Sequence, residues 1–176
     1  MISGLLHAQS WQKSEKVDTF SSQPYVEYTL TGKFLTPPRE TGIDAPVIVM
    51  DCMPGEKRYA GKWYFRGANL NIHISTGAVV DSKADGVGVW FRRDEGKSQF
   101  AVWSNSKDGT ALFPTGPYLN QIIYGHDLVH KEGTTPPVKK LVLMVDEYLA
   151  ARIVMEFDLP DSQEVYDACG LTIHQK

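Results

Sequence analysis

The sequence predicts a mainly β protein: a single-domain antiparallel β-sandwich with two short helices. Two apolar runs, Gly86–Arg92 and Lys97–Ser104, flank the turn-forming segment Arg93–Gly96 and indicate a β-hairpin. Further short apolar runs follow one another along the chain, with turn residues between them. Strands that alternate with long helical segments, the pattern of a parallel α/β sheet, are absent from the sequence.

Length and composition fit one globular domain. The chain has 176 residues, of which 42% are hydrophobic and 22% charged, and its formal net charge is −3. Proteins that bind a phosphate backbone usually carry an excess of basic residues. This chain has no such excess, so nucleic acid is not an expected partner. The longest apolar runs, such as Leu141–Val145 and Ile153–Phe157, are far shorter than the ~20 residues of a transmembrane helix, so no membrane span is expected. The sequence carries no signal for an oligomeric state.

Residues 1–23 are predicted to lie outside the domain, which then covers residues 24–176. Met1–Gln9 resembles the end of a truncated leader, because a short apolar stretch runs into Ala8 and the chain then turns polar. No basic region precedes this stretch, and a frayed apolar N-terminus of a cytosolic protein is the alternative. Residues 9–23 are polar and rich in Ser, Gln and Lys, which predicts a mobile arm.

The first strands of the domain are predicted from alternation and from a β-branched run. Every second residue of Tyr25–Leu30 is apolar, as in a half-buried strand. Val47–Cys52 is continuously apolar up to its last two residues and predicts a central strand buried on both faces. Tyr59–Phe65 and Asn69–Ser75 are the next expected strands, joined by a turn at Arg66–Ala68.

The central hairpin also carries a prediction of register. A type I turn over Arg93–Gly96, with Gly96 in the left-handed conformation, pairs Val87 with Val102 and Val89 with Phe100. In this register one face is an apolar patch. The other face places Trp90 opposite Gln99 and Gly86 opposite Trp103.

The C-terminal half is predicted to contain a second hairpin and both short helices. Val138–Val145 and Ala151–Leu159 are the β-rich runs of that hairpin. Helices are expected at Pro117–Tyr124, which ends before Gly125, and at Gln163–Ala168, which ends before Gly170.

No catalytic or metal-binding pattern stands out. The sequence contains no G-x-S-x-G elbow, no phosphate-binding glycine loop and no H-E-x-x-H helix, so we expect no enzyme, no catalytic residues and no cofactor. Two of the histidines, His126 and His130, would share a metal only if one helix continued through both, and no metal site is expected. The other histidines are His7, His73 and His174.

The candidate binding site is the tryptophan face of the central hairpin. Trp90 and Trp103 flank positions with almost no side chain, and Arg92 and Gln99 are the expected polar partners. Such a slot would accept a sugar ring, a peptide edge or an aromatic group by stacking. Packing of both indoles in the core is the alternative, because large aromatic side chains need the room that glycine leaves.

Cys52 and Cys169 are the two cysteines of the chain. A disulfide between them would close nearly the whole domain, and in the chain-entropy model a loop of ~100 residues stabilises the fold by about 4.7 kcal/mol. Two buried free thiols are the alternative. A zinc site would need a C-x-x-C pair or paired histidines, which do not accompany these cysteines.

A series of short features runs in a recognisable order from Val47 to the end of the chain. The pieces are Val49–Cys52, Val89–Asp94, Trp103-Ser104, Phe113-Pro114, Leu119–Ile123, Phe157–Leu159 and Ala168-Cys169. This order resembles that of small periplasmic accessory proteins associated with bacterial type VI secretion. Residues 9–46 and 130–137 have no counterpart in that pattern, and Pro160 stands where the family tends to have glycine. The resemblance implies an exported, disulfide-tied β domain and transfers no catalytic residue.

These features together predict a periplasmic or secreted, non-enzymatic binding or accessory protein of the bacterial cell envelope. Its expected partner is a protein or a cell-wall component. One alternative is an inhibitor or immunity-type protein that plugs an envelope enzyme with the hairpin tip Arg92–Lys97. A second alternative is a hydrolase whose site has no recognised motif.

Overall fold

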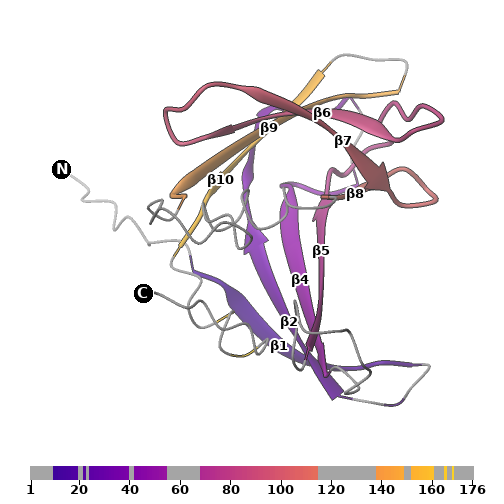
Figure 1. Cartoon of the computed structure of the whole chain (residues 1–176), viewed down its shortest axis with the longest axis vertical. Coiled ribbons are helices and arrows are strands. Elements are labelled where there is room, and N and C mark those ends of the chain that lie inside the picture. The colour runs from indigo at the N-terminus through magenta and orange to yellow at the C-terminus, as the bar shows by residue number, and fades with distance from the viewer. Residues whose placement is uncertain are drawn as a thin grey trace, which may run out of the picture.

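The computed structural model describes residues 10–19, 22, 24–39, 42–54, 68–114, 138–148 and 152–160, together with Val165 and Ala168. The described strands are β1 (Gln12–Val17), β2 (Pro24–Thr31), β3 (Lys33–Thr36), β4 (Val47–Pro54), β5 (Ala68–Ser75), β6 (Val87–Arg93), β7 (Gln99–Asn105), β8 (Ala111–Phe113), β9 (Lys140–Asp146) and β10 (Arg152–Asp158). All their pairings are antiparallel, in the order β1-β2-β4-β5-β8-β7-β6-β9-β10-β3 (Figure 1). A mainly β, antiparallel fold is therefore confirmed.

The sheet has two halves that share one core. The short strand β8 joins them, because it pairs with β5 through Leu112 and with β7 through Phe113. In Figure 1, β6, β7 and β9 cross the top of the molecule, and β2, β4 and β5 descend below them. The buried cluster draws on both halves, from Tyr28, Ile48 and Ile74 to Val89, Leu143 and Phe157. The described strands thus form one continuous hydrogen-bonded sheet, whereas the sequence suggested the two separate sheets of a sandwich.

The N-terminal prediction needs a correction, because Gln12–Val17 is a strand within the segment expected to be a mobile arm. β1 pairs with β2 from Gln12↔Thr29 to Val17↔Pro24. Five of its six residues are exposed, as befits an edge strand with no apolar face to bury. Charged and polar side chains at almost every position hide such a strand from a hydrophobicity pattern.

Several predicted strands are confirmed, with one change in burial. β2 buries Tyr28 and Leu30 on its inner face, as the alternation of Tyr25–Leu30 predicted. The hairpin of β9 and β10 is present and pairs Val145 with Ile153. β4 was predicted to be buried on both faces, which is wrong for its first half. Ile48 is fully buried, but its neighbours Val47 and Val49 remain partly exposed on the outer face.

Other predicted elements fall where the structure gives little or no description. The expected strand Tyr59–Phe65 and the expected helix Pro117–Tyr124 lie outside the described residues. Within the expected helix Gln163–Ala168, Val165 and Ala168 are helical and Val165 is fully buried. The short strands β3 and β8 were not predicted, because runs of three or four residues are too short to show a period.

Gly32 joins two strands that lie at opposite ends of the sheet. β2 neighbours the edge strand β1, whereas β3 forms the other edge and pairs with β10. A Cβ atom at Gly32 would lie 2.5 Å from Phe157 Cδ1 and 2.6 Å from the Glu156 carbonyl oxygen. Only glycine therefore lets the chain pass this close to β10.

The hairpin of β6 and β7 is present, but its predicted register is wrong by one residue. The structure pairs Val87 with Trp103 and Val89 with Ala101, rather than with Val102 and Phe100. The inner face consequently carries Val87, Val89, Phe91, Ala101 and Trp103, all of them buried. Apolar residues occupy both faces of β7, so the hydrophobic pattern did not distinguish the two registers.

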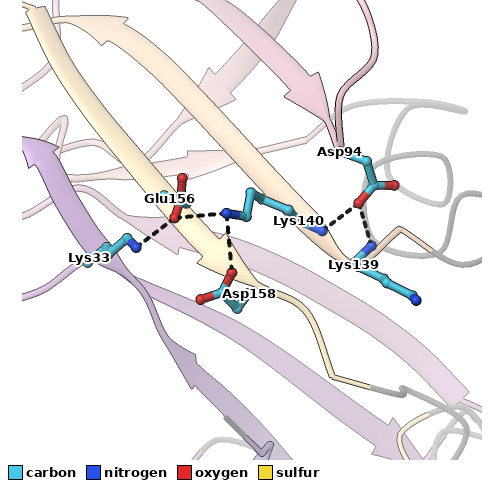
Figure 2. A network of polar contacts seen from close by, with 6 residues as sticks. All are labelled: Lys33, Asp94, Lys139, Lys140, Glu156 and Asp158. Atoms are coloured by element: carbon cyan, nitrogen blue, oxygen red, sulfur yellow. Dashed lines mark hydrogen bonds and ion pairs between the residues drawn. The ribbon is translucent and has the colours of Figure 1, made fainter. Parts of the chain in front are cut away.

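The turn between β6 and β7 explains the shift in register. Asp94, and not Gly96, has a positive φ, of 47°. The Asp94 backbone N–H donates to the Lys140 carbonyl oxygen at 2.8 Å. Its carboxylate oxygen Oδ1 accepts the backbone N–H groups of Lys139 and Lys140, each at 2.9 Å (Figure 2). Asp94 thus anchors the turn to the start of β9, and aspartate is among the few side chains that tolerate this conformation.

Candidate binding site

Two aromatic side chains lie on the outer face of the central hairpin. Trp90 of β6 and Phe100 of β7 are paired across the strands and are 45% and 52% exposed. Their ring centroids are 5.1 Å apart and their planes are inclined by 56°. Met144 of β9 pairs with Trp90 from the other side, and Val102 of β7 is also exposed. Single exposed apolar residues are ordinary, but a contiguous patch across three strands is typical of a binding surface.

The patch forms the floor of a shallow groove of about 300 Å³. Gly88 lies opposite Val102 and adds no side chain to this floor. A Cβ atom at Gly88 would lie 3.1 Å from Phe100 Cε2, so the ring of Phe100 leans over bare backbone. The groove is at the small end of the range for ligand sites and suits a single side chain or a comparable group.

The rim of the groove is charged. Asp81, Lys83 and Asp85 come from the segment that leads into β6, and Asp146 and Arg152 come from the facing ends of β9 and β10. Asp146 and Arg152 pair with each other at 3.2 Å. Asp81 and Asp85 are exposed and have no side-chain partner among the described residues.

Backbone hydrogen bonds fix the acidic part of the rim. Lys83 and Gly86 exchange hydrogen bonds of 2.9 and 3.0 Å and hold Asp85 in a tight turn. Gly86 has φ 123°, and a Cβ atom there would lie 2.5 Å from the Trp103 carbonyl oxygen. The Asp81 N–H donates to the Asp146 carbonyl oxygen at 2.8 Å. The backbone that carries the two carboxylates is therefore held in place before binding, which reduces the entropy lost on binding.

The structure separates the four residues of the predicted binding slot. Trp90 and Arg92 lie on the outer face and are exposed. Trp103 points the other way, is fully buried and lies 6.1 Å from the Phe91 ring. Gln99 is exposed near the hairpin end, where its amide oxygen accepts a hydrogen bond from Arg93 at 3.5 Å. The prediction of a slot between two indoles is therefore wrong, because in the observed register the Trp103 side chain points into the core.

Phe100 and Val102 occupy the outer face of β7, the face to which the sequence assigned Gln99 and Trp103. The prediction missed them because it placed both on the buried face. Asp81 and Asp85 were missed for another reason: tertiary hydrogen bonds bring their segment to the groove, and no local sequence pattern marks it.

A separate polar network lies on the outer face of β3, β9 and β10 (Figure 2). Glu156 is 9% exposed and contacts Lys33 Nζ at 2.7 Å and Lys140 Nζ at 3.4 Å. Lys140 also lies 3.9 Å from Asp158. Every charge in this network has an opposite charge beside it, which indicates a structural role in holding the edge strand β3.

A second pair of carboxylates lies on the other half of the sheet. Glu27 of β2 is paired in register with Asp51 of β4, which is 9% exposed. Glu27 accepts a hydrogen bond from Ser14 at 3.2 Å and lies 3.5 Å from Lys16. Burial, followed by the charges of Asp51 and Glu27, raises the pKa of the nearby Tyr25. Within the described ranges, no cluster of three or more His, Cys, Asp or Glu side chains could hold a metal ion.

The predicted disulfide stays a prediction. Cys52 is 5% exposed and belongs to the core cluster, whereas Cys169 lies outside the described residues. His7, His126, His130 and His174 lie outside them as well. Among the helical positions that the structure describes, none belongs to a helix long and apolar enough to cross a membrane.

In comparisons with protein families, with curated proteins and with solved structures, no match to this chain was found.

Proposed function

We propose that this protein is an exported, non-enzymatic binding or accessory protein of the bacterial cell envelope. It engages its partner through the outer face of the β6–β7 hairpin. The observation that carries this proposal is the exposed pair of Trp90 and Phe100 on the floor of a groove with a charged rim. Aromatic side chains in such a setting are typical energetic centres of binding surfaces.

The exported location rests on the two cysteines and on the family resemblance of the sequence. Cys52 occupies a buried position on β4, where a bond to Cys169 would tie the C-terminal segment to the core. Such a bond persists in the periplasm or outside the cell, where thiols are kept oxidised.

An inhibitor or immunity-type role is the alternative that one further observation favours. The tip of the β6–β7 hairpin is anchored by Asp94, while Glu95, Lys97 and Ser98 beside it are exposed. A preorganised exposed turn is the form that an enzyme-plugging element needs.

Site-specific photo-crosslinking in cells tests the proposed binding face. A benzophenone amino acid replaces Phe100 in one variant and Val17, a residue of β1 that is even more exposed, in a control variant. We expect a discrete adduct from position 100 and none from position 17. The additional substitution Trp90→Ala is expected to abolish the adduct without unfolding the protein. Equal adducts at both positions, or none at position 100, would refute the proposal.

The same experiment distinguishes the inhibitor alternative. A third variant carries the crosslinker at Lys97 on the hairpin tip, which belongs to the exposed turn and not to the groove. An adduct from Lys97 that survives Trp90→Ala would favour the hairpin tip as the contact.

A further inference from the structure

We infer that the groove beside Trp90 binds a cationic side chain, lysine or arginine, presented by a segment of a protein partner. This inference rests on the proposed function and specifies the chemistry that the binding face recognises. It is carried by the juxtaposition of two exposed aromatic rings with two carboxylates that have no ion-pair partner among the described residues.

The aromatic rings supply the first attraction for a cation. Trp90 and Phe100 are inclined by 56°, so the two rings form a notch rather than a flat platform. A cation within about 6 Å of a ring centroid is attracted by the negative face of the ring, most strongly for tryptophan. With centroids 5.1 Å apart, one cation can lie within that range of both rings.

The rim supplies the second attraction. Arg152 already neutralises Asp146. Of the other charged residues that line the groove, Asp81 and Asp85 are negative and Lys83 is positive. The groove therefore has a net negative charge. A neutral sugar ring would leave that charge uncompensated, whereas a lysine or arginine head group would balance it.

The shape of the apolar surface favours a side chain on a polypeptide over a small free amine. In register, Phe100, Trp90, Met144 and Val154 form a row across β7, β6, β9 and β10. Val154 is partly exposed and lies outside the groove, so this row continues beyond it. The aliphatic stem of a lysine or arginine packs on such a surface while its head group reaches the charged rim. Neighbouring residues of the same segment cover the rest of the row.

An NMR titration with a matched pair of peptides tests this inference. The first probe is the peptide acetyl-Gly-Leu-Arg-Leu-Gly-amide, and the second has neutral citrulline in place of arginine. The signal is the indole N–H resonance of Trp90, assigned with the Trp90→Phe variant. We expect the arginine peptide to shift this resonance, with an affinity about fivefold to tenfold higher than that of the citrulline peptide. We also expect its affinity to fall as salt is added.

The rim carboxylates are tested by substitution. The double variant Asp81→Asn/Asp85→Asn is expected to lower the affinity for the arginine peptide about fivefold while its affinity for the citrulline peptide stays unchanged. The control variant Glu15→Gln/Asp44→Asn removes the same charge from exposed positions outside the groove, and we expect it to bind like the parent protein.

Three results would overturn the inference: equal affinity for both peptides, no shift by the arginine peptide at millimolar concentration, or a shift produced by N-acetylglucosamine oligomers instead. These results leave the proposed function standing if the crosslink from position 100 persists. Loss of that crosslink would refute the proposed function itself.

Discussion

Glu156 has an unusual setting for a carboxylate on the outer face of a sheet. The hydrogen bond from Lys33 lowers the pKa of Glu156, although burial acts in the opposite direction. The same hydrogen bond raises the pKa of Lys33. Since the unfolded chain binds a proton at Glu156 more readily than the folded protein does, this stabilisation is lost as the pH falls through the folded-state pKa. The contribution of Lys33 is present below its ordinary pKa of 10.5 and is lost at higher pH.

We therefore expect Glu156→Gln to reduce the free energy of unfolding at pH 7 by about 1 kcal/mol and to flatten its decline below pH 4.5. Urea unfolding between pH 3 and pH 7 measures both effects. Asp158→Asn is the matched control, because Asp158 is largely exposed and its contact with Lys140 is long, at 3.9 Å. An acid decline as steep in Glu156→Gln as in the parent protein would contradict this account.

Trp90 and Trp103 differ in what their removal should cost. Trp103 is fully buried in the core, and its indole N–H has no hydrogen-bond partner within the described part of the chain. We expect Trp103→Ala to destabilise the protein by about 3–5 kcal/mol, as other large-to-small core substitutions do. Trp90→Ala should cost less than about 1 kcal/mol, because half-exposed surface residues contribute little. Denaturant unfolding of the two variants, checked by near-ultraviolet circular dichroism, compares these costs.

At the scale of elements, the β6–β7 turn depends on one side chain. Asp94 combines a left-handed backbone conformation with a carboxylate oxygen that accepts two N–H groups of β9. Both properties are needed to hold the hairpin against its neighbour strand.

Three substitutions of Asp94 separate these properties. Asp94→Asn keeps an acceptor oxygen and tolerates the backbone conformation, so it should cost less than about 1 kcal/mol. Asp94→Gly keeps the conformation but loses the acceptor, with an expected cost of about 1–2 kcal/mol. Asp94→Ala loses both and should cost about 1 kcal/mol more than glycine. Thermal unfolding of the three variants gives the ranking, and an alanine variant as stable as the asparagine variant would contradict it.

How far the sequence predicts each element depends on how its residues are exposed. β2 buries Tyr28 and Leu30 on one face, and alternation located it, whereas β9 and β10 were located as β-rich runs. β1 buries neither face, and its polar and charged residues show no hydrophobic alternation, so it was predicted to be a mobile arm. The register of β6 and β7 was missed because Phe100 and Val102 are as apolar as the residues that face the core. It was also missed because Asp94, rather than Gly96, takes the left-handed conformation in the turn.

The candidate site was predictable to a similar extent. Trp90 and Arg92 were placed on one face by the alternation of β6, which needs no knowledge of a partner strand. Their neighbours across β7 depended on the register and were therefore wrong. The acidic rim comes from contacts between distant segments, such as that of Asp81 with Asp146, and local patterns do not report such contacts.

At the scale of the whole molecule, the predicted bond between Cys52 and Cys169 would tie the C-terminal segment to β4. We expect the protein, expressed with its upstream region and purified without reductant, to weigh less than its reduced form by two hydrogen atoms. The same mass spectrum reports whether a leader has been removed. Reduction should lower the free energy of unfolding by about 2–5 kcal/mol, and the double variant Cys52→Ala/Cys169→Ala should be insensitive to reductant. Identical masses with and without reductant would contradict the predicted bond.

The corner at Gly32 sets the order in which a growing chain can complete this fold. β3 is made early, yet its neighbour among the described strands is β10, which the ribosome adds on the order of a hundred residues later. Until Arg152–Asp158 has been synthesised, Lys33–Thr36 has no strand to join, although β2 directly before it can already pair with β4. Synthesis of the β9–β10 hairpin is therefore the step that gives β3 its partner, and a chain that stops before Arg152 leaves β3 without its pairing to β10.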